Sequence, residues 1–446
     1  MNEVSRRSLL KVGLFSGAML VTAPILAACS SPAGGGASAS GGRAAINLWT
    51  HDKAYSSYFT SQAKAFNSKK STPYTFSIDT TTYAAADLVT KLLAAASANQ
   101  PTPDMVGLEI GQFPRLMKNN IAASLLASWD DRIAKVKDDL IASRLAPYTV
   151  DGKVYGLDSS NPICVYYYRT DLVEQYKVPN PETWEEFAEF GATFHQQTGK
   201  SLVPISTGPD NGSVSAGFLQ FLLQRGGAFF DKNGKLAIDS DETVDTIEFI
   251  AAGLKSGFML GLDNFYGGPI QAGFKSDTLL GAAMPDWYNT YGIQATVPEQ
   301  KGKWAIRPMP KFAKGGFPTS TAGGTGFTGL KGHKNTTAVM DLIGDSYLTT
   351  DGQVKRFQQT GYLPTLKSAY ENKTLLDYTD AYLGGQKTFT VYAKLADHVP
   401  PFYQSANMPI ISDVFGGPLL DAYKGKIDAK TAISQAVSAY KQQVSG

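Results

Sequence analysis

The sequence predicts an α/β fold of two lobes that enclose a central cleft, and three observations lead to this prediction. The chain has 446 residues, more than one hydrophobic core usually serves, so we expect two domains. In the amino-terminal third, β-rich segments alternate with segments of helical periodicity, the pattern of a mainly parallel sheet covered by helices. Near the middle of the chain, a polar run separates two strand-like segments.

That polar run lies within residues 148–172, around which we take the rest of the chain to be organised. Asp151-Gly152 predicts a hairpin turn, because both residue types accept positive φ. Residues 158–162 are too polar for the middle of a buried strand, whereas residues 163–168 form a continuous β-branched and aromatic run. The polar run fits an ordinary surface loop in one large domain. It also fits a hinge between two lobes, in which polar side chains such as Asn161 face the cleft.

In the first lobe we expect strands and helices in alternation. Strands are predicted at residues 45–50, 74–78 and 103–108, and helices at residues 55–67 and 87–98. Asp52 and Lys53 follow the first strand, and Glu109 follows the third. Because ligands of such sheets lie beyond the carboxyl ends of the strands, we predict these three side chains at the binding site. As alternatives, Asp52 caps the next helix and Glu109 merely starts one.

The second lobe is predicted from a helix start and several strand ends. Thr183 and Glu186 have the spacing of a capping box, which begins a helix and places Trp184 in the core. Further strands are expected at residues 202–207 and 279–284, helices at residues 217–224 and 242–255, and a tight turn between short strands at residues 231–235. Asp210 lies at the polar exit of the strand at residues 202–207, so we include it in the site.

The strand at residues 279–284 ends before Pro285 and Asp286 and is followed by Trp287 and Tyr288. A tryptophan just beyond a strand end can present its ring to a ligand as a stacking platform. We therefore place Trp287 and Tyr288 in the site. The alternative interpretation makes Trp287 an anchor of the core.

Two later segments are predicted to carry the chain back and forth between the lobes. Residues 317–330 are glycine-rich and favour a strand that returns to the first lobe, with Gly324 at the cleft. The glycines formally fit a dinucleotide fingerprint, but no helix starts directly after them, so we reject nucleotide binding. Residues 361–365 are predicted as a third crossing that carries Tyr362. An aromatic loop at residues 400–403 adds Tyr403 to the predicted site.

The amino terminus has the features of an export signal. Arg6-Arg7 resembles the twin-arginine signal, an apolar stretch follows at residues 12–28, and the segment ends at Cys29 in a sequence that resembles a lipobox. We therefore expect residues 1–28 to be a signal peptide, Cys29 to carry lipid, and residues 29–43 to be a flexible tether. A short transmembrane anchor is the alternative for the apolar stretch.

The composition excludes several classes of function. The chain has 41 basic and 39 acidic residues, a formal net charge of +2, so nothing indicates a nucleic acid partner. The four histidines are scattered without metal-ligand spacing, and the serine-hydrolase elbow is absent. Cys164, in an apolar strand, is expected to be a buried structural thiol. We predict no catalytic residue, no metal and no cofactor, and hence not an enzyme.

Several short segments, in the same order, resemble one family. They are DGKVYGLD and YYYRTDL around the polar run, PDMVGLEIGQF before it, and PETWEEF, GYLPT and GKIDAKTAI after it. Together they resemble the bacterial extracellular solute-binding proteins of the maltose-binding-like branch, which serve ABC importers. The resemblance implies a periplasmic-binding-protein-like fold with discontinuous lobes, residues 44–158 plus 324–363 and residues 159–323 plus 364–446.

The resemblance also implies a function. We expect a monomer, anchored through lipid on the extracytoplasmic face of the cell membrane, that binds a carbohydrate, in particular an oligosaccharide, and delivers it to ABC permease subunits. Sugars suit such a site because their CH faces stack on aromatic rings and their hydroxyls pair with carboxylates and amides. The alternative ligand is a glycerol-phosphate-type solute, which would require more cations than Lys53. A secreted carbohydrate hydrolase is a further alternative, because it needs two opposed carboxylates and Asp52 with Glu109 could supply them.

Overall fold

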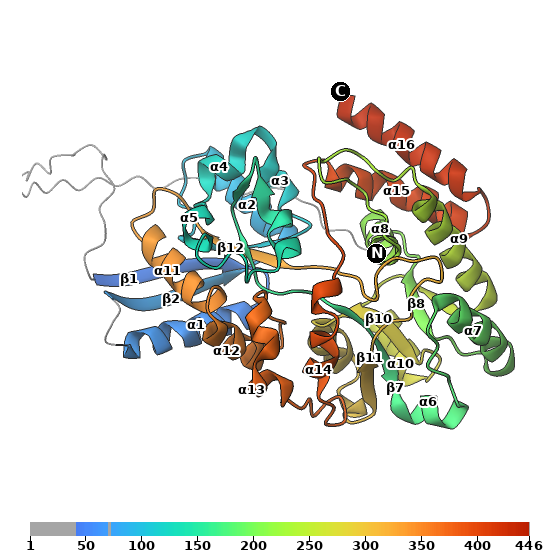
Figure 1. Ribbon diagram of the computed structural model, residues 1–446. Helices are drawn as coiled ribbons and strands as arrows, with labels where there is room; N and C mark the ends of the chain where they lie inside the picture. Colours follow the sequence, from blue (N-terminus) through green and yellow to red (C-terminus); the bar gives the residue numbers. More distant parts are fainter. Residues whose placement is uncertain (1–41, 70–72, 446) are drawn as a thin grey trace, which may run out of the picture. The chain divides into compact units, whose positions relative to one another are not determined.

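The computed structural model describes residues 42–69 and 73–445. The predicted signal peptide and Cys29 lie outside these residues. One half of the described chain is built on a five-stranded sheet of order β2-β1-β3-β12-β6 (Figure 1). These strands are β1 Gly42–Thr50, β2 Tyr74–Thr82, β3 Met105–Glu109, β6 Leu157–Asp158 and β12 Thr325–Gly329. The strands β2 and β3 run parallel to β1, and β12 runs antiparallel to β3 and β6.

Helices alternate with strands in this first half, as the sequence predicts. They are α1 Lys53–Ser68 and α2 Ala85–Ser97, and later in the chain α11 Thr336–Tyr347 and α12 Thr350–Thr360. The helix α1 begins at Lys53 because the Asp52 side chain accepts a hydrogen bond from the Ala54 amide at 2.8 Å. The apolar face of α1 then packs its aromatic side chains against Phe327 of β12.

The second half contains a three-stranded sheet of order β10-β7-β11 and a separate parallel pair, β8 with β9. The strands are β7 Cys164–Arg169, β8 Val203–Ser206, β9 Met259–Leu262, β10 Gly281–Pro285 and β11 Trp304–Arg307. The longer helices are α7 Trp184–Thr198, α8 Asn211–Arg225, α9 Asp241–Ser256, α15 Met408–Tyr423 and α16 Ala429–Ser445. Cys164 is buried in β7, where burial raises the pKa of its thiol, in agreement with a structural role.

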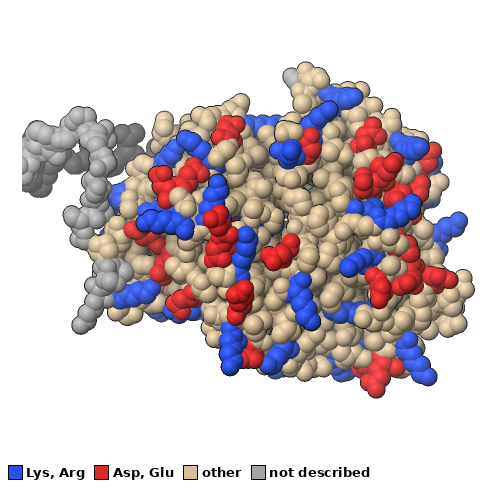
Figure 2. Space-filling view, in the orientation of Figure 1, with Lys and Arg blue, Asp and Glu red and all other residues tan. Residues whose placement is uncertain are grey.

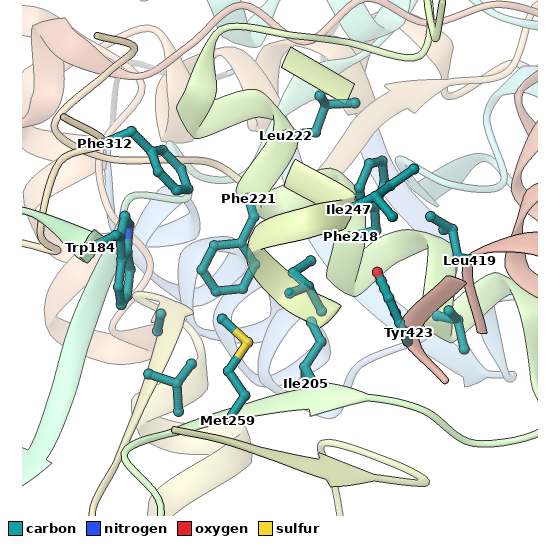
Figure 3. Packing of buried hydrophobic residues seen from close by; sticks show 14 of the residues in the cluster. Trp184, Ile205, Phe218, Phe221, Leu222, Ile247, Met259, Phe312, Leu419 and Tyr423 are labelled. Carbon is teal, nitrogen blue, oxygen red and sulfur yellow. The ribbon is translucent and has the colours of Figure 1, made fainter. Parts of the chain in front are cut away.

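Trp184 lies in the hydrophobic core of this half, as predicted. Its side chain is fully buried, and its indole Nε1 donates to Oε1 of Gln224 at 2.8 Å. Figure 3 shows Trp184 beside Phe312 and Phe221, with residues of α8 and α15 completing the core. The capping box that precedes Trp184 is present with both of its hydrogen bonds.

The remaining elements are short. They are the strands β4 Thr149–Val150 and β5 Lys153–Val154 and the helices α3 Pro114–Met117, α4 Ile121–Leu125, α5 Asp130–Ile133, α6 Thr170–Tyr176, α10 Gly268–Lys275, α13 Lys373–Leu376 and α14 Thr388–Ala393. The predicted hairpin is confirmed, since β4 pairs with β5 around Asp151 and Gly152, whose φ angles are 50° and 76°. On the face shown in Figure 2, acidic and basic side chains are interspersed.

The chain passes between the two sheets at the predicted places. The polar run connects β6 of the first sheet to β7 of the second, and the glycine-rich segment connects β11 back to β12. The two connections are tied together by Arg144, whose guanidinium forms a buried ion pair with Asp158 at 2.5 Å and donates to the Gly323 carbonyl at 3.1 Å.

Three sequence predictions need correction. The helix predicted at residues 217–224 begins at Asn211, because Asp210 caps it by accepting from the amides of Gly212 and Ser213. The short strands expected around residues 231–235 reduce to one isolated bridge between Phe230 and Leu236. The first sheet mixes parallel and antiparallel pairs, because β12 returns from the second half. The helix α12 packs its Phe357 ring on Tyr378 and Phe389, which follow it in the chain.

Candidate functional site

A cavity of about 630 Å³ lies where the two halves meet. Its lining combines residues at the ends of β1, β2 and β3 and in α1 with residues that follow β9 and β10. Residues of the two connections and of the segment after α12 complete it. The lining residues are His51, Asp52, Lys53, Tyr55, Thr82, Glu109, Ser160, Tyr266, Trp287, Tyr291, Gly323, Gly324, Thr325 and Tyr362. Its volume lies within the range of about 300–1,000 Å³ that is typical of small-molecule sites.

Asp52 is both a helix cap and a polar group of the cavity, so its two predicted roles are compatible. While Oδ1 caps α1, Oδ2 accepts hydrogen bonds from the hydroxyls of Tyr291 and Tyr362, each at 2.5 Å. Tyr291 follows β10 in the second half, so this carboxylate joins the two halves across the cavity. The rings of Tyr291 and Tyr362 stack with centroids 6.3 Å apart, which adds an aromatic surface beside the carboxylate.

Glu109 is the second carboxyl group of the cavity, at the carboxyl end of β3. Its Oε2 accepts a hydrogen bond from the Gly111 amide at 2.8 Å, which fixes the side chain in place. Burial raises the pKa of Glu109 to about 7, and the nearby Asp158 carboxylate acts in the same direction. Near neutral pH this group therefore exchanges between a form that can donate a hydrogen bond and a form that only accepts.

Trp287 lies at the cavity wall, half-buried. Its indole Nε1 donates to the Ala322 carbonyl at 2.8 Å, and its ring stacks with Tyr266, with centroids 6.2 Å apart and planes inclined by 20°. Gly323 has a φ of 83°, and a Cβ there would lie 3.0 Å from the indole nitrogen, so the glycine lets the connection pass close to the ring. Tyr266 as a residue remains 42% exposed. The two rings therefore offer an aromatic surface to a ligand.

Ten residues were predicted for the site, and the structure brings six of them together at the cavity. These six are Asp52, Lys53, Glu109, Trp287, Gly324 and Tyr362. At Gly324, φ is 138° and a Cβ would lie 2.7 Å from the Asp158 carboxylate, so the position requires glycine.

The other four predicted residues lie elsewhere. Asn161 is buried in the connection, where its Nδ2 donates to the hydroxyl of Tyr370 at 3.2 Å. Tyr288 is fully buried, with its hydroxyl on the Phe265 carbonyl at 2.7 Å. Asp210 serves as the cap of α8. Tyr403 lines a different pocket, beside Phe230 and Lys232.

Sequence reasoning missed several lining residues. They are His51, Tyr55, Thr82, Ser160, Tyr266, Tyr291, Gly323 and Thr325. Ser160 could have been found, because it belongs to the polar run that was predicted to face the cleft. Tyr266 lies in an irregular loop before α10, and Tyr291 lies in a single wide helical turn after β10. Neither segment has the regular spacing of apolar residues from which the direction of a side chain could be predicted.

The chemistry of the lining is that of a binding site for a neutral, hydroxyl-rich ligand. Carboxyl groups accept hydrogen bonds from hydroxyls, and the aromatic surfaces of Trp287, Tyr266 and Tyr291 suit CH faces. Within residues 42–69 and 73–445 no cluster of three or more metal-ligating side chains is found. None of the helices in the described part of the chain combines the length and hydrophobicity that a membrane span requires.

Comparison with known proteins gives consistent results. A family model described as bacterial extracellular solute-binding protein matches residues 61–381. The arabinooligosaccharide-binding protein of Bacillus subtilis (strain 168) is 27% identical over 440 residues, which cover 95% of this chain and 98% of that protein. The lactose-binding protein of Rhizobium radiobacter is 24% identical over 369 residues, 80% of this chain and 82% of that protein.

A solved structure supports the fold. The cyclic alpha-maltosyl-1,6-maltose binding protein from Arthrobacter globiformis superposes with a TM-score of 0.74 at 20% identity, over 89% of this chain and 98% of that one. This similarity confirms the predicted α/β architecture of periplasmic-binding-protein type.

Proposed function

This chain belongs to the family of bacterial extracellular solute-binding proteins, and we propose that it captures an oligosaccharide in the cavity between its two halves. It then delivers the sugar to the membrane subunits of an ABC importer. The family is one of binding proteins, in agreement with the prediction that the chain is not an enzyme. Two relatives that align over most of their length are named for binding arabinooligosaccharides and lactose, which supports a sugar ligand.

The observation that carries the proposal is the pairing of carboxyl groups with aromatic rings in one cavity. Asp52 and Glu109 provide fixed hydrogen-bond acceptors, while Trp287 and Tyr266 provide a ring surface. Among the described lining residues Lys53 is the one lysine, and arginine is absent. Glycerol 3-phosphate would bring a dianionic group, for which paired guanidinium groups are the usual partners. The lining therefore favours a neutral sugar.

The two connections between the sheets and the predicted third crossing at residues 361–365 are the natural hinges of such a protein. We propose lobes formed by residues 44–158 plus 324–363 and by residues 159–323 plus 364–446. Sugar binding would close these lobes, a hinge motion known for periplasmic binding proteins. Tyr291 of one lobe already meets Asp52 of the other, so closure can be stabilised by contacts at the cavity itself.

The membrane attachment is proposed from the sequence alone. Arg6-Arg7 would direct export, and lipid on Cys29 would hold the protein at the outer face of the membrane. Replacing Cys29 by alanine should release the protein from the membrane fraction. A Cys29→Ala protein that stays in the membrane with its amino terminus intact would show that the apolar stretch is an anchor instead.

Isothermal titration calorimetry tests the ligand class. The panel should contain arabinotriose, lactose, maltotriose and glycerol 3-phosphate, and the sugars should be analysed for cleavage after incubation. We expect at least one of these sugars to bind without being cleaved and glycerol 3-phosphate not to bind. Cleavage of a bound sugar, or binding of glycerol 3-phosphate alone, would contradict the proposal.

A further inference from the structure

A second cavity adjoins the first. It has a volume of about 190 Å³, several times the roughly 30 Å³ that a water molecule occupies in the liquid. Glu109 and Gly323 line both cavities, so they form the partition between them. The smaller cavity, here called the side chamber, extends from this partition towards α8 and α15.

The side chamber differs from the main cavity in chemistry. Most of the large side chains that line it are apolar, namely Leu219, Leu223, Phe229, Phe402 and Met408. Among the described residues that line it, Glu109 is the one with a carboxyl group. The side chamber therefore suits an apolar group attached to a ligand that passes the partition.

Several polar side chains of the side chamber are already held by the protein. Arg144 is paired with Asp158 at 2.5 Å. The Ser215 hydroxyl donates to the Ser412 carbonyl at 2.7 Å, and the Gln220 amide donates to the Ala283 carbonyl at 2.7 Å. A further sugar ring would bring several hydroxyls into a space with few free partners, and each unpaired hydroxyl would oppose binding.

Gln404 differs from these polar side chains, because one of its polar atoms has no hydrogen-bond partner. Its side chain is only 8% exposed, and its Nε2 donates to the Ile110 carbonyl at 2.5 Å. Because that carbonyl can only accept, the amide NH₂ must face it. The amide oxygen of Gln404 is buried without a hydrogen-bond partner. One hydrogen-bond donor on a ligand, such as a hydroxyl group, would satisfy this buried acceptor.

From these observations we infer that the side chamber binds an aromatic substituent, bearing a hydroxyl group, of the glycan that occupies the main cavity. This inference rests on the proposed function. The substituted sugar stacks at Trp287, the linkage passes between Glu109 and Gly323, and the ring enters among Phe229, Phe402 and the aliphatic side chains. Its hydroxyl donates to Gln404. The protein thus selects aryl-substituted glycans over the plain sugar.

Ala216 offers a way to block the side chamber. It lies on α8, is exposed, and lines the side chamber without lining the main cavity. In Ala216→Phe the added ring would occupy the space proposed for the substituent. The control is Ala94→Phe, since Ala94 is also an exposed helical alanine, on α2, and lines neither cavity.

The experiment compares the methyl, phenyl and 4-hydroxyphenyl glycosides of a sugar that binds in the panel above. The 4-hydroxyphenyl glycoside should bind on the order of tenfold more tightly than the methyl glycoside, through burial of its ring. Ala216→Phe should abolish this gain and leave the methyl glycoside unaffected, whereas Ala94→Phe should keep the gain. The phenyl glycoside should fall between the other two.

The outcomes separate the inference from the proposed function. If the methyl glycoside binds but the 4-hydroxyphenyl glycoside gains nothing, or if the gain survives in Ala216→Phe, the inference is overturned and the sugar site stands. If the phenyl and 4-hydroxyphenyl glycosides bind equally, the contact with Gln404 is refuted. If no glycoside binds at all, the proposed function itself fails.

Discussion

Replacing Trp287 by alanine should weaken sugar binding, because the indole lies at the wall of the main cavity. For the loss of stacking we take the range of base–aromatic stacking, which is about 1–3 kcal/mol. This corresponds to a loss of affinity of about 5- to 150-fold. Because the effect comes from the ring surface, Trp287→Phe should retain most of the affinity.

The effect on stability can be worked out from the contacts of the indole. Trp287 is half-buried, with one hydrogen bond to the Ala322 carbonyl, worth about 0.5–1.5 kcal/mol, and aromatic contacts with Tyr266 and Tyr288, each worth a similar amount. The free energy of unfolding of Trp287→Ala should therefore fall by about 1.5–4.5 kcal/mol. Trp287→Phe should lose about 0.5–1.5 kcal/mol, because only the hydrogen bond is removed.

Trp184 provides the matched comparison for these variants. It is fully buried in the core, so Trp184→Ala should cost about 3–5 kcal/mol of stability. Thermal denaturation and titration calorimetry on all three variants give both quantities. A Trp287→Ala protein that is as destabilised as Trp184→Ala, yet binds sugar with unchanged affinity in its folded fraction, would identify Trp287 as a core anchor and refute the reasoning.

Three further predictions concern polar groups. Tyr291→Phe removes a hydroxyl that donates to Asp52 across the cavity, so the free energy of unfolding should fall by about 1.5–3 kcal/mol; an unchanged melting temperature would contradict this. Burial raises the pKa of Asp286 from 3.8 to about 7, so the folded state holds the proton more tightly and loses stability as pH rises from about 4 to 7. The expected loss in the free energy of unfolding is on the order of 4 kcal/mol across this pH range. In Asp286→Asn this loss should be absent from denaturation curves measured over the same range. Because ionised carboxylates accept stronger hydrogen bonds, sugar affinity should rise from pH 6 to 8 as Glu109 ionises, and Glu109→Gln should make calorimetric affinities independent of pH there.

Residues that follow strands were the predictable part of the site. Asp52 and Glu109 reach the cavity because β1 and β3 run parallel and end at the same edge of the sheet. Trp287 reaches it because β10 ends just before the cavity wall. The sequence shows where a strand ends, and in a parallel sheet the strand ends share one edge. The residues that follow such strands could therefore be predicted at the cavity.

Tyr266 and Tyr291 were not predictable, because irregular segments deliver them. The direction of a side chain in a loop depends on local backbone angles and on tertiary contacts, neither of which a periodic pattern reveals. The prediction that Asp210 lies at the cavity was wrong for a different reason, because a regular helix determines its position. The helix after it begins six residues earlier than predicted, at Asn211 instead of 217, so its carboxylate caps backbone amides and does not line the cavity.

The polar run shows why a hinge sequence gives an ambiguous signal. A chain that crosses between two sheets leaves the hydrogen bonding of both, so side chains of the connection must satisfy buried backbone and side-chain groups. Asp158 accepts from the amides of Ser160 and Thr325 as well as from Arg144, and Asn161 donates to Tyr370. Only Ser160 remains to face the cavity. Polarity in the sequence therefore correctly marked the crossing, but most of that polarity supports the crossing itself and not the ligand.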